Sequence, residues 1–236
     1  AYIHETLSIQ LDTRLKEMGV SGYSIENVSQ IQDKNGEWRP IDSDKDPTVI
    51  LLHYPSILED TINYIPPRVK IEISCLSMDE PTELRQIRSL IGESFAGEDT
   101  DADSFVRTVV PTRTFLEKLF LLAEEFQKEK PRSVRMSRHL YDLEKLMDTE
   151  YGKEALSNRE LYDAIVEHRK AYYALKYVNY DSHTPSTINF TIPESAIGAW
   201  KDDYADMRRF FIYGESLEYD ALIQKMRELQ ERVRIM

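Results

Sequence analysis

The spacing of apolar residues changes near Pro111 from a mixture of strand and helix patterns to mainly helix patterns, and this change most limits the possible folds. Upstream, residues 69–75 alternate apolar and polar side chains, which predicts a half-buried strand. Downstream, residues 114–126 and 137–147 repeat apolar side chains every three or four positions, which predicts amphipathic helices. Strands that precede a run of helices favour an α+β fold over a regular β–α–β winding.

The remaining predicted elements follow from the same two patterns. Helices are expected over residues 3–18, 81–91, 158–177, 196–211 and 216–233. Further strands are expected over residues 23–31, 48–54 and 105–110. We therefore expect two portions. Residues 1–111 would form a mixed sheet with flanking helices, and residues 112–236 would be mainly helical.

The charge balance excludes a protein that coats nucleic acid over its whole surface. The formal net charge is −12, whereas phosphate binding is driven by Lys and Arg side chains that displace counterions. A polyanion would therefore have to meet a local patch. The densest basic cluster comprises Lys128, Lys130, Arg132, Arg135 and Arg138. The same charges would also suit a solvated helix junction.

Two further features of the composition limit where the protein works. The chain has one cysteine, which excludes an internal disulfide and a zinc site built from cysteines. The longest apolar run, around residues 49–52, is far too short to span a bilayer. We therefore expect a cytoplasmic protein with no membrane partner, in which any metal is held by oxygen ligands.

Lys118 lies at the border of the apolar stripe of the helix predicted over residues 114–126. Thr114 and Glu117 have the spacing of a capping box at the beginning of that helix. A bordering lysine usually lays its stem on the core and sends its ammonium group into water. A lysine that points into a cleft would instead be a point charge for a triphosphate.

The stretch "RHLYDLEKLM" places polar side chains beside a buried face. Its leucines share one face of the predicted helix, and His139 and Asp142 flank that face. Arg138 precedes Asp142 by four residues, which is the spacing of a surface ion pair. Alternatively, Asp142 would accept a proton from an attacking hydroxyl, with Arg138 near a phosphate. The spacing alone does not choose between these two interpretations.

Glu72 lies on the polar face of the strand predicted over residues 66–75. A solvent-exposed carboxylate or a cross-strand pair with a lysine is one interpretation. The other is a metal ligand or general base, because a carboxylate on a rigid strand is a well-placed oxygen ligand for Mg²⁺.

Five segments, taken in order, resemble a known family. "VKIEIS", "VPTRTFLEKLFLL", "RHLYDLEKLM", "VEHRKAYYALKY" and "WKDDYADMRRFFIYG" are similar to the AbiEii-type nucleotidyltransferase toxins of abortive-infection and toxin–antitoxin systems. The resemblance implies a nucleotidyltransferase-like fold and transfer of a nucleotidyl group from a nucleoside triphosphate, with Mg²⁺ or Mn²⁺. It also implies an RNA acceptor such as tRNA and a cognate antitoxin.

The resemblance also assigns roles to the candidate residues. Lys118, within "EKL", matches the lysine that holds the triphosphate. Asp142 matches the aspartate of the "DLYDL"-like motif, and Arg138 matches the arginine before it, although His139 stands where an acidic residue is more frequent. Glu72 matches a third carboxylate that would bind the metal.

One departure from the family pattern limits the expected activity. No Gly-Ser turn leading into a Ser-Asp-x-Asp strand occurs in the sequence, and the family places this metal-binding motif upstream of the first helix. The missing methionine favours truncation of a longer enzyme, so we expect activity from the full-length protein and none from the chain as given. The alternative is a degenerate, non-catalytic binding protein with the same fold.

Overall fold

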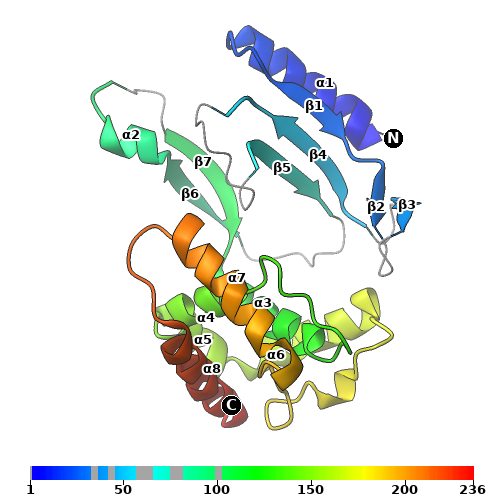
Figure 1. The fold of residues 1–236 in the computed structure, drawn as a ribbon, viewed down its shortest axis with the longest axis vertical. Coiled ribbons are helices and arrows are strands. Elements are labelled where there is room, and N and C mark those ends of the chain that lie inside the picture. Colours follow the sequence, from blue (N-terminus) through cyan, green and yellow to red (C-terminus); the bar gives the residue numbers. More distant parts are fainter. Residues whose placement is uncertain (1, 33–36, 42–45, 57–65, 75–81, 99–102) are drawn as a thin grey trace. The chain divides into compact units, whose positions relative to one another are not determined.

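The computed structural model describes residues 2–32, 37–41, 46–56, 66–74, 82–98 and 103–236 (Figure 1). The chain divides into two compact units, Ala1–Ser77 and Met78–Met236. The predicted α+β class is confirmed, because helices and small sheets make up the described residues. The change of character predicted between residues 111 and 112 falls inside the second unit, since a β-hairpin precedes its helices.

The first unit is built on an antiparallel sheet with the strand order β1–β4–β5. β4 (Thr48–His53) is central, pairing with β1 (Ser24–Asn27) and β5 (Arg68–Ile73). Val49, Ile50 and Leu51 of β4 are all buried, as expected for a strand with neighbours on both sides. A separate hairpin joins β2 (Gln30–Gln32) to β3 (Trp38–Pro40). The strands predicted over residues 48–54 and 66–75 are confirmed, whereas the single strand predicted over residues 23–31 is divided into β1 and β2, which belong to different sheets.

Helix α1 (Tyr2–Glu17) runs beside the sheet and packs on β1 and β4 (Figure 1). Ser8 is buried in this contact, and its hydroxyl donates a hydrogen bond to Asn27 Oδ1 at 2.6 Å. The helix ends before Gly19, whose φ of 74° is the left-handed conformation that glycine adopts at little cost. The predicted end of this helix is therefore confirmed.

The second unit begins with a hairpin where the sequence predicted a helix. β6 (Thr82–Arg88) pairs antiparallel with β7 (Asp103–Val109) along its whole length. The short helix α2 (Leu90–Ser94) belongs to the connection between the two strands. The predicted helix over residues 81–91 is therefore wrong. The spacing of Leu84, Ile87 and Ile91 is typical of a helix. However, hydrogen bonding with β7 stabilises an extended strand here, and this long-range pairing outweighs the local pattern.

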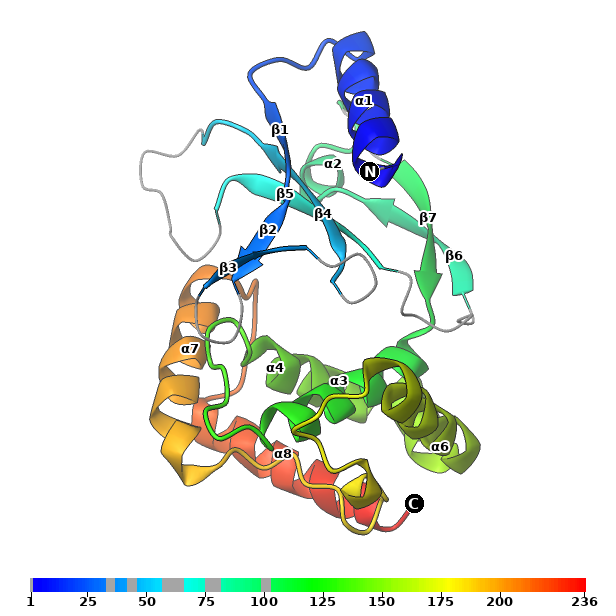
Figure 2. The same ribbon diagram turned by 90° about the vertical axis from the view of Figure 1, so that its right-hand side faces the viewer.

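Helix α3 (Pro111–Glu125) is the centre of the second unit. It packs against α4 (Arg138–Met147), α5 (Glu150–Ser157) and α6 (Arg159–His168), as Figure 2 shows for α4 and α6. Its buried face holds the fully buried side chains Phe115, Leu116, Leu119, Phe120 and Leu122. The helix begins at Pro111, whose fixed φ suits a first helical position. The predicted capping box does not form, because the first turn lies three residues earlier.

The remaining helices complete the core around α4. α8 (Tyr219–Arg234) packs on α4, and α7 (Ile197–Phe210) packs on α8. The short helix α5 was not predicted. Its Gly152 lies so close to the end of α4 that an added Cβ would collide with the Leu146 carbonyl oxygen. Glycine is therefore required at this contact.

The helix predicted over residues 158–177 changes its geometry halfway. After α6 the chain forms a π-helical turn over Arg169–Tyr173 and then reverses at Ala174, whose φ is 43°. Short 3-10 turns at Tyr180–Ser182 and Glu194–Ala196 follow in the irregular connection to α7. Within the described ranges, no helix combines the length and apolar character needed to cross a bilayer.

Candidate active site

Helices α3 and α4 bring Lys118 and Asp142 together. The Lys118 ammonium donates a hydrogen bond to Asp142 Oδ2 at 2.6 Å, although the two residues are 24 positions apart. The Lys118 side chain is 23% exposed and that of Asp142 is 35% exposed. Both residues flank fully buried leucines of their own helices, Leu119 on α3 and Leu143 on α4. The core therefore fixes the backbone of both residues while their charged ends stay within reach of solvent.

His139 lies beside this pair as a neutral group. Its side chain is buried, and its Nδ1 atom has no hydrogen-bond partner among the described residues. Burial, together with the positive charges of Lys118 and Arg138, lowers the pKa of His139 to about 4. The imidazole is therefore uncharged at neutral pH. It adds no positive charge that would compete with Lys118 for an anion.

Arg138 stands at the exposed beginning of α4. Asp142 pairs with Lys118 instead of Arg138, so the ion pair suggested by their spacing of four residues does not form. Among the residues that the structure describes, Arg138 has neither a hydrogen bond nor an ion pair. Its guanidinium group remains available to an anion that approaches the beginning of this helix.

The basic cluster predicted over residues 128–138 is partly neutralised. Glu125 is buried at the end of α3, and it accepts hydrogen bonds from Lys128 Nζ at 2.8 Å and from Arg132 NH2 at 2.7 Å. Burial alone would raise the pKa of Glu125, but these two cations outweigh burial and hold the pKa below its usual value. Lys128 and Arg132 therefore stabilise the turn after α3. Their ion pairs with Glu125 leave them less available to bind phosphate than unpaired cations would be.

Asp203 of α7 holds the turn that leads into α4. Its buried carboxylate accepts hydrogen bonds from the Arg135 backbone N–H at 2.5 Å and from the Ser137 backbone N–H at 3.0 Å. The Ser137 hydroxyl donates a third bond, at 2.5 Å. These bonds support Arg135 in its left-handed conformation, with φ of 58°. They therefore fix the start of α4, and in this way they help to position Asp142 on that helix.

A buried ion cluster fixes another side of α3. The Arg169 Nε atom donates to Glu124 Oε1 at 2.7 Å, and its NH2 atom donates to Glu124 Oε2 at 2.5 Å. The NH1 atom of Arg169 donates to Glu117, which also accepts from Arg113. Arg169 and Glu124 are about 95% buried. Each charge meets opposite charges, so the cluster locks the π-helical turn onto α3.

Glu72 lies on β5 of the first unit. Its Oε1 atom is 2.7 Å from Lys70 Nζ on the same strand, and both side chains are half exposed. Glu72 is therefore exposed and paired with a lysine, but the partner lies on the same strand and not across the sheet as predicted. Among the residues that the structure describes, no three His, Cys, Asp or Glu side chains gather as a metal site. The described side chains alone do not make a Mg²⁺ site.

Sequence reasoning did not find Asp203, Glu124 or Arg169. A signal existed for Asp203, because it lies three residues after Trp200 and four before Met207, on the buried face of α7. An acid on an apolar stripe requires donors in the core. The partners of Arg169 depend on how α3 and α6 pack, and this packing is not visible in local spacing.

The arrangement suits the binding of an anion. Lys118 supplies a mobile ammonium group, Asp142 supplies a carboxylate within hydrogen-bond distance, and Arg138 supplies an exposed guanidinium group nearby in the sequence. A model of the family described as nucleotidyl transferase AbiEii toxin, type IV toxin–antitoxin system, matches residues 10–225. No curated protein matches the chain. Because the family match spans most of the 236 residues, this chain belongs to the AbiEii nucleotidyl transferase toxin family.

Proposed function

We propose that the full-length protein transfers a nucleotidyl group from a nucleoside triphosphate to an RNA acceptor, with tRNA the foremost candidate. Lys118 would hold the triphosphate, Asp142 would accept a proton, and Arg138 would bind a phosphate at the beginning of α4. The observation that carries the proposal is the contact of 2.6 Å between Lys118 and Asp142 across two helices. We further propose that the protein acts in the cytoplasm and that a cognate antitoxin restrains it.

The exposure of the pair supports a binding role. Among the residues that the structure describes, Lys118 and Asp142 each make one ionic contact, and about a quarter to a third of each side chain is exposed. A lysine ammonium has three donors, and a carboxylate can accept several hydrogen bonds. Both groups therefore have capacity left for a ligand, and the lysine can turn from Asp142 to a phosphate without unfolding its helix.

The proposed reaction uses both groups. The oxygen of an acceptor hydroxyl attacks the α-phosphorus of the triphosphate, an oxygen–phosphorus bond forms, and the bond from that phosphorus to pyrophosphate breaks. The hydroxyl proton passes to the Asp142 carboxylate. The Lys118 ammonium compensates the negative charge on the phosphates and departing pyrophosphate.

Dependence on Mg²⁺ or Mn²⁺ is part of the proposal, and Glu72 is its candidate ligand in the described residues. Mg²⁺ is usually bound by one or two carboxylates together with substrate phosphates. The Asp-x-Asp motif of the family would have to supply the other ligands. We therefore expect the full-length enzyme to be active and residues 1–236 alone to be inactive.

The second candidate function is binding without catalysis. It is favoured by the absence of the Gly-Ser motif from the sequence and by the ion pair of Glu72 with Lys70. In that case the protein would bind a nucleoside triphosphate through Lys118 but would transfer nothing.

The test is incorporation of labelled nucleotide into total tRNA by the full-length protein, with each of the four triphosphates and Mg²⁺. We expect transfer by the wild type and a loss of at least about 100-fold in Asp142→Ala, the usual size for a general base, and in Lys118→Ala, the usual size for a lost electrostatic contact to the transition state. Lys145→Ala is the matched control, because Lys145 lies on α4, where it pairs with the neighbouring Glu144 and lies over the Tyr141 ring.

Three outcomes separate the alternatives. Unchanged incorporation in Lys118→Ala and Asp142→Ala would refute the assigned roles. Binding of a triphosphate by the wild type without transfer would support the non-catalytic protein. Equal losses in Lys145→Ala and Lys118→Ala would refute a specific role of Lys118 and point to a general loss of folded structure, which circular dichroism measures directly.

A further inference from the structure

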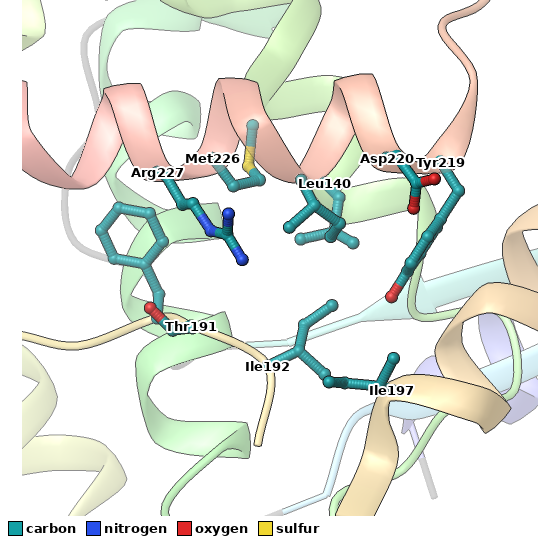
Figure 3. Close-up of a pocket in the computed structure, with 10 residues that line it drawn as sticks. Leu140, Thr191, Ile192, Ile197, Tyr219, Asp220, Met226 and Arg227 are labelled. Atoms are coloured by element: carbon teal, nitrogen blue, oxygen red, sulfur yellow. The ribbon is translucent and has the colours of Figure 1, made fainter. Parts of the chain in front are cut away.

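A cavity of about 350 Å³ lies in the second unit, and neither Lys118 nor Asp142 lines it. It is bounded by α8, by the beginning of α7, by the segment of residues 190–192 and by Leu140 of α4 (Figure 3). Its walls are largely apolar, with Leu140, Ile192 and Ile197 facing the space and Met226 contributing to the lining. Its volume lies within the range of small-molecule sites.

The hydroxyl group of Tyr219 is the first sign that the cavity takes a ligand. The side chain is 9% exposed, and its hydroxyl oxygen is buried without a hydrogen-bond partner among the described residues. Figure 3 shows the ring descending from α8, with the hydroxyl group pointing toward Ile192 and Ile197. A buried hydroxyl group without a partner is unfavourable. A polar group on a ligand would satisfy it.

Arg227 is the second sign. It lines the cavity from the middle of α8, and Figure 3 shows its guanidinium group reaching into the space. The other three basic residues of α8 form ion pairs: Lys225 with Glu228, Arg232 with Asp148, and Arg234 with Glu231. Arg227 has no such pair within the described part of the chain.

Asp220 places a negative charge at the end of the cavity opposite the positive charge of Arg227. It also lines the cavity and lies seven residues before Arg227, which is about 10 Å along a helix axis. Asp220 is in the first turn of α8, where the partial positive charge of the helix end compensates a carboxylate. Arg227 has no such compensation. The unbalanced charge at the cavity is therefore positive and lies at the Arg227 end.

We propose that this cavity binds a small amphipathic carboxylate that carries a second polar group on its apolar body. The carboxylate accepts the paired hydrogen bonds of the Arg227 guanidinium group. The apolar body lies against Leu140, Ile192 and Met226, and the second polar group accepts a hydrogen bond from Tyr219. An engineered cavity of about 150 Å³ takes benzene, so this space has room for a chain of about eight carbons.

This inference is independent of the proposed function, because none of its ligand contacts uses Lys118 or Asp142. The two sites nevertheless share a helix. Leu140 lines the cavity, and Asp142 lies two residues further along α4.

Isothermal titration calorimetry on the whole chain tests the proposal with 8-hydroxyoctanoate, octanoate and octylamine. We expect 8-hydroxyoctanoate to bind more tightly than octanoate, and octylamine to bind least. Arg227→Gln should weaken 8-hydroxyoctanoate about tenfold, the effect of one lost charge-assisted contact. Tyr219→Phe should abolish the preference for 8-hydroxyoctanoate over octanoate.

Arg234→Gln is the matched control, because it removes an arginine from the same helix outside the cavity. Its Kd for 8-hydroxyoctanoate should stay within about twofold of wild type, well below the tenfold effect of a lost charged contact. Thermal melting of each variant checks that it is folded. An unchanged Kd in Arg227→Gln, tighter binding of octylamine, or no binding of any of the three compounds would overturn the proposal.

Discussion

Two charged regions of α3 differ in how fully their hydrogen bonds are used. On one side, Arg169 donates to both Glu117 and Glu124 inside the protein, and almost none of the Arg169 or Glu124 side chain meets solvent. On the other side, Lys118 and Asp142 share one contact and remain partly exposed. The same helix therefore carries one saturated ion cluster and one ion pair with capacity left.

The difference separates structural charges from charges available to a ligand. A buried ion network is costly to break, because removing one partner leaves the others buried and uncompensated. A partly exposed pair contributes little to stability, because water can replace either partner. We therefore assign Arg169 and Glu124 to holding α3 in place, and Lys118 and Asp142 to binding.

The largest effect is expected from Arg169→Met. This change leaves Glu124 and Glu117 without the buried cation, and the free energy of unfolding should fall by about 3–5 kcal/mol. Arg159→Met is the control, because Arg159 pairs with Asp163 on an exposed surface, and it should cost about 0.5 kcal/mol or less. Urea denaturation measures both values. Equal costs would remove the distinction between buried and exposed pairs.

The next effect is a pH dependence that arises at His139. Its pKa is about 4 in the folded protein, against an ordinary value of 6.5. The unfolded chain therefore binds the proton first as the pH falls, and stability is lost between about pH 6.5 and 4. Across this pH range, the free energy of unfolding of His139→Leu should fall by about 3 kcal/mol less than that of the wild type. Identical pH profiles of the two proteins would show that His139 is not buried as a neutral group.

A smaller effect is expected from Asp203→Asn. The amide has one acceptor oxygen where the carboxylate has two, so one of the three donors on the turn before α4 loses its partner. The free energy of unfolding should fall by about 2 kcal/mol, the size of a lost hydrogen bond to a charged group. Asp206→Asn, an exposed change on the same helix, is the control. If Asp206→Asn costs as much, Asp203 does not anchor α4.

The smallest effect on stability is expected from Lys118→Met. Methionine keeps much of the apolar stem, and the partly exposed Asp142 can be solvated, so the cost should be about 1 kcal/mol or less. Thermal and urea denaturation measure it against the Arg169→Met variant. A cost near that of Arg169→Met would place Lys118 among the structural charges.

Apolar periodicity predicted the elements whose environment is set locally. Helices α1, α4, α7 and α8 and strands β4 and β5 lie close to their predicted ranges. The failures depend on distant partners. β6 became a strand because it pairs with β7, and the predicted capping box at Thr114 failed because the helix begins at Pro111. Helix α5 was not predicted because it is short and contains Gly152, a residue that disfavours helix in local sequence patterns.

The sequence also placed Lys118 and Asp142 at the margins of their helices, and the structure places the two side chains in contact. Spacing along α4 suggested Arg138 as the partner of Asp142. The actual partner, Lys118, lies on another helix, and spacing within one helix carries no information about such a contact. Whether Glu72 serves the same chemistry stays a prediction. The partners of Asp203 lie 66 and 68 residues away, beyond the reach of any local pattern.

The most direct test of the distinction between binding and structural charges compares two lysines of the second unit in the full-length protein. Titration calorimetry gives the Kd of each nucleoside triphosphate for wild type, Lys118→Met and Lys128→Met. The binding role of Lys118 predicts a Kd at least about tenfold weaker in Lys118→Met. In Lys128→Met the Kd should be unchanged, because Lys128 is bound to the buried Glu125. Equal affinities in wild type and Lys118→Met, or a larger loss in Lys128→Met, would contradict this assignment.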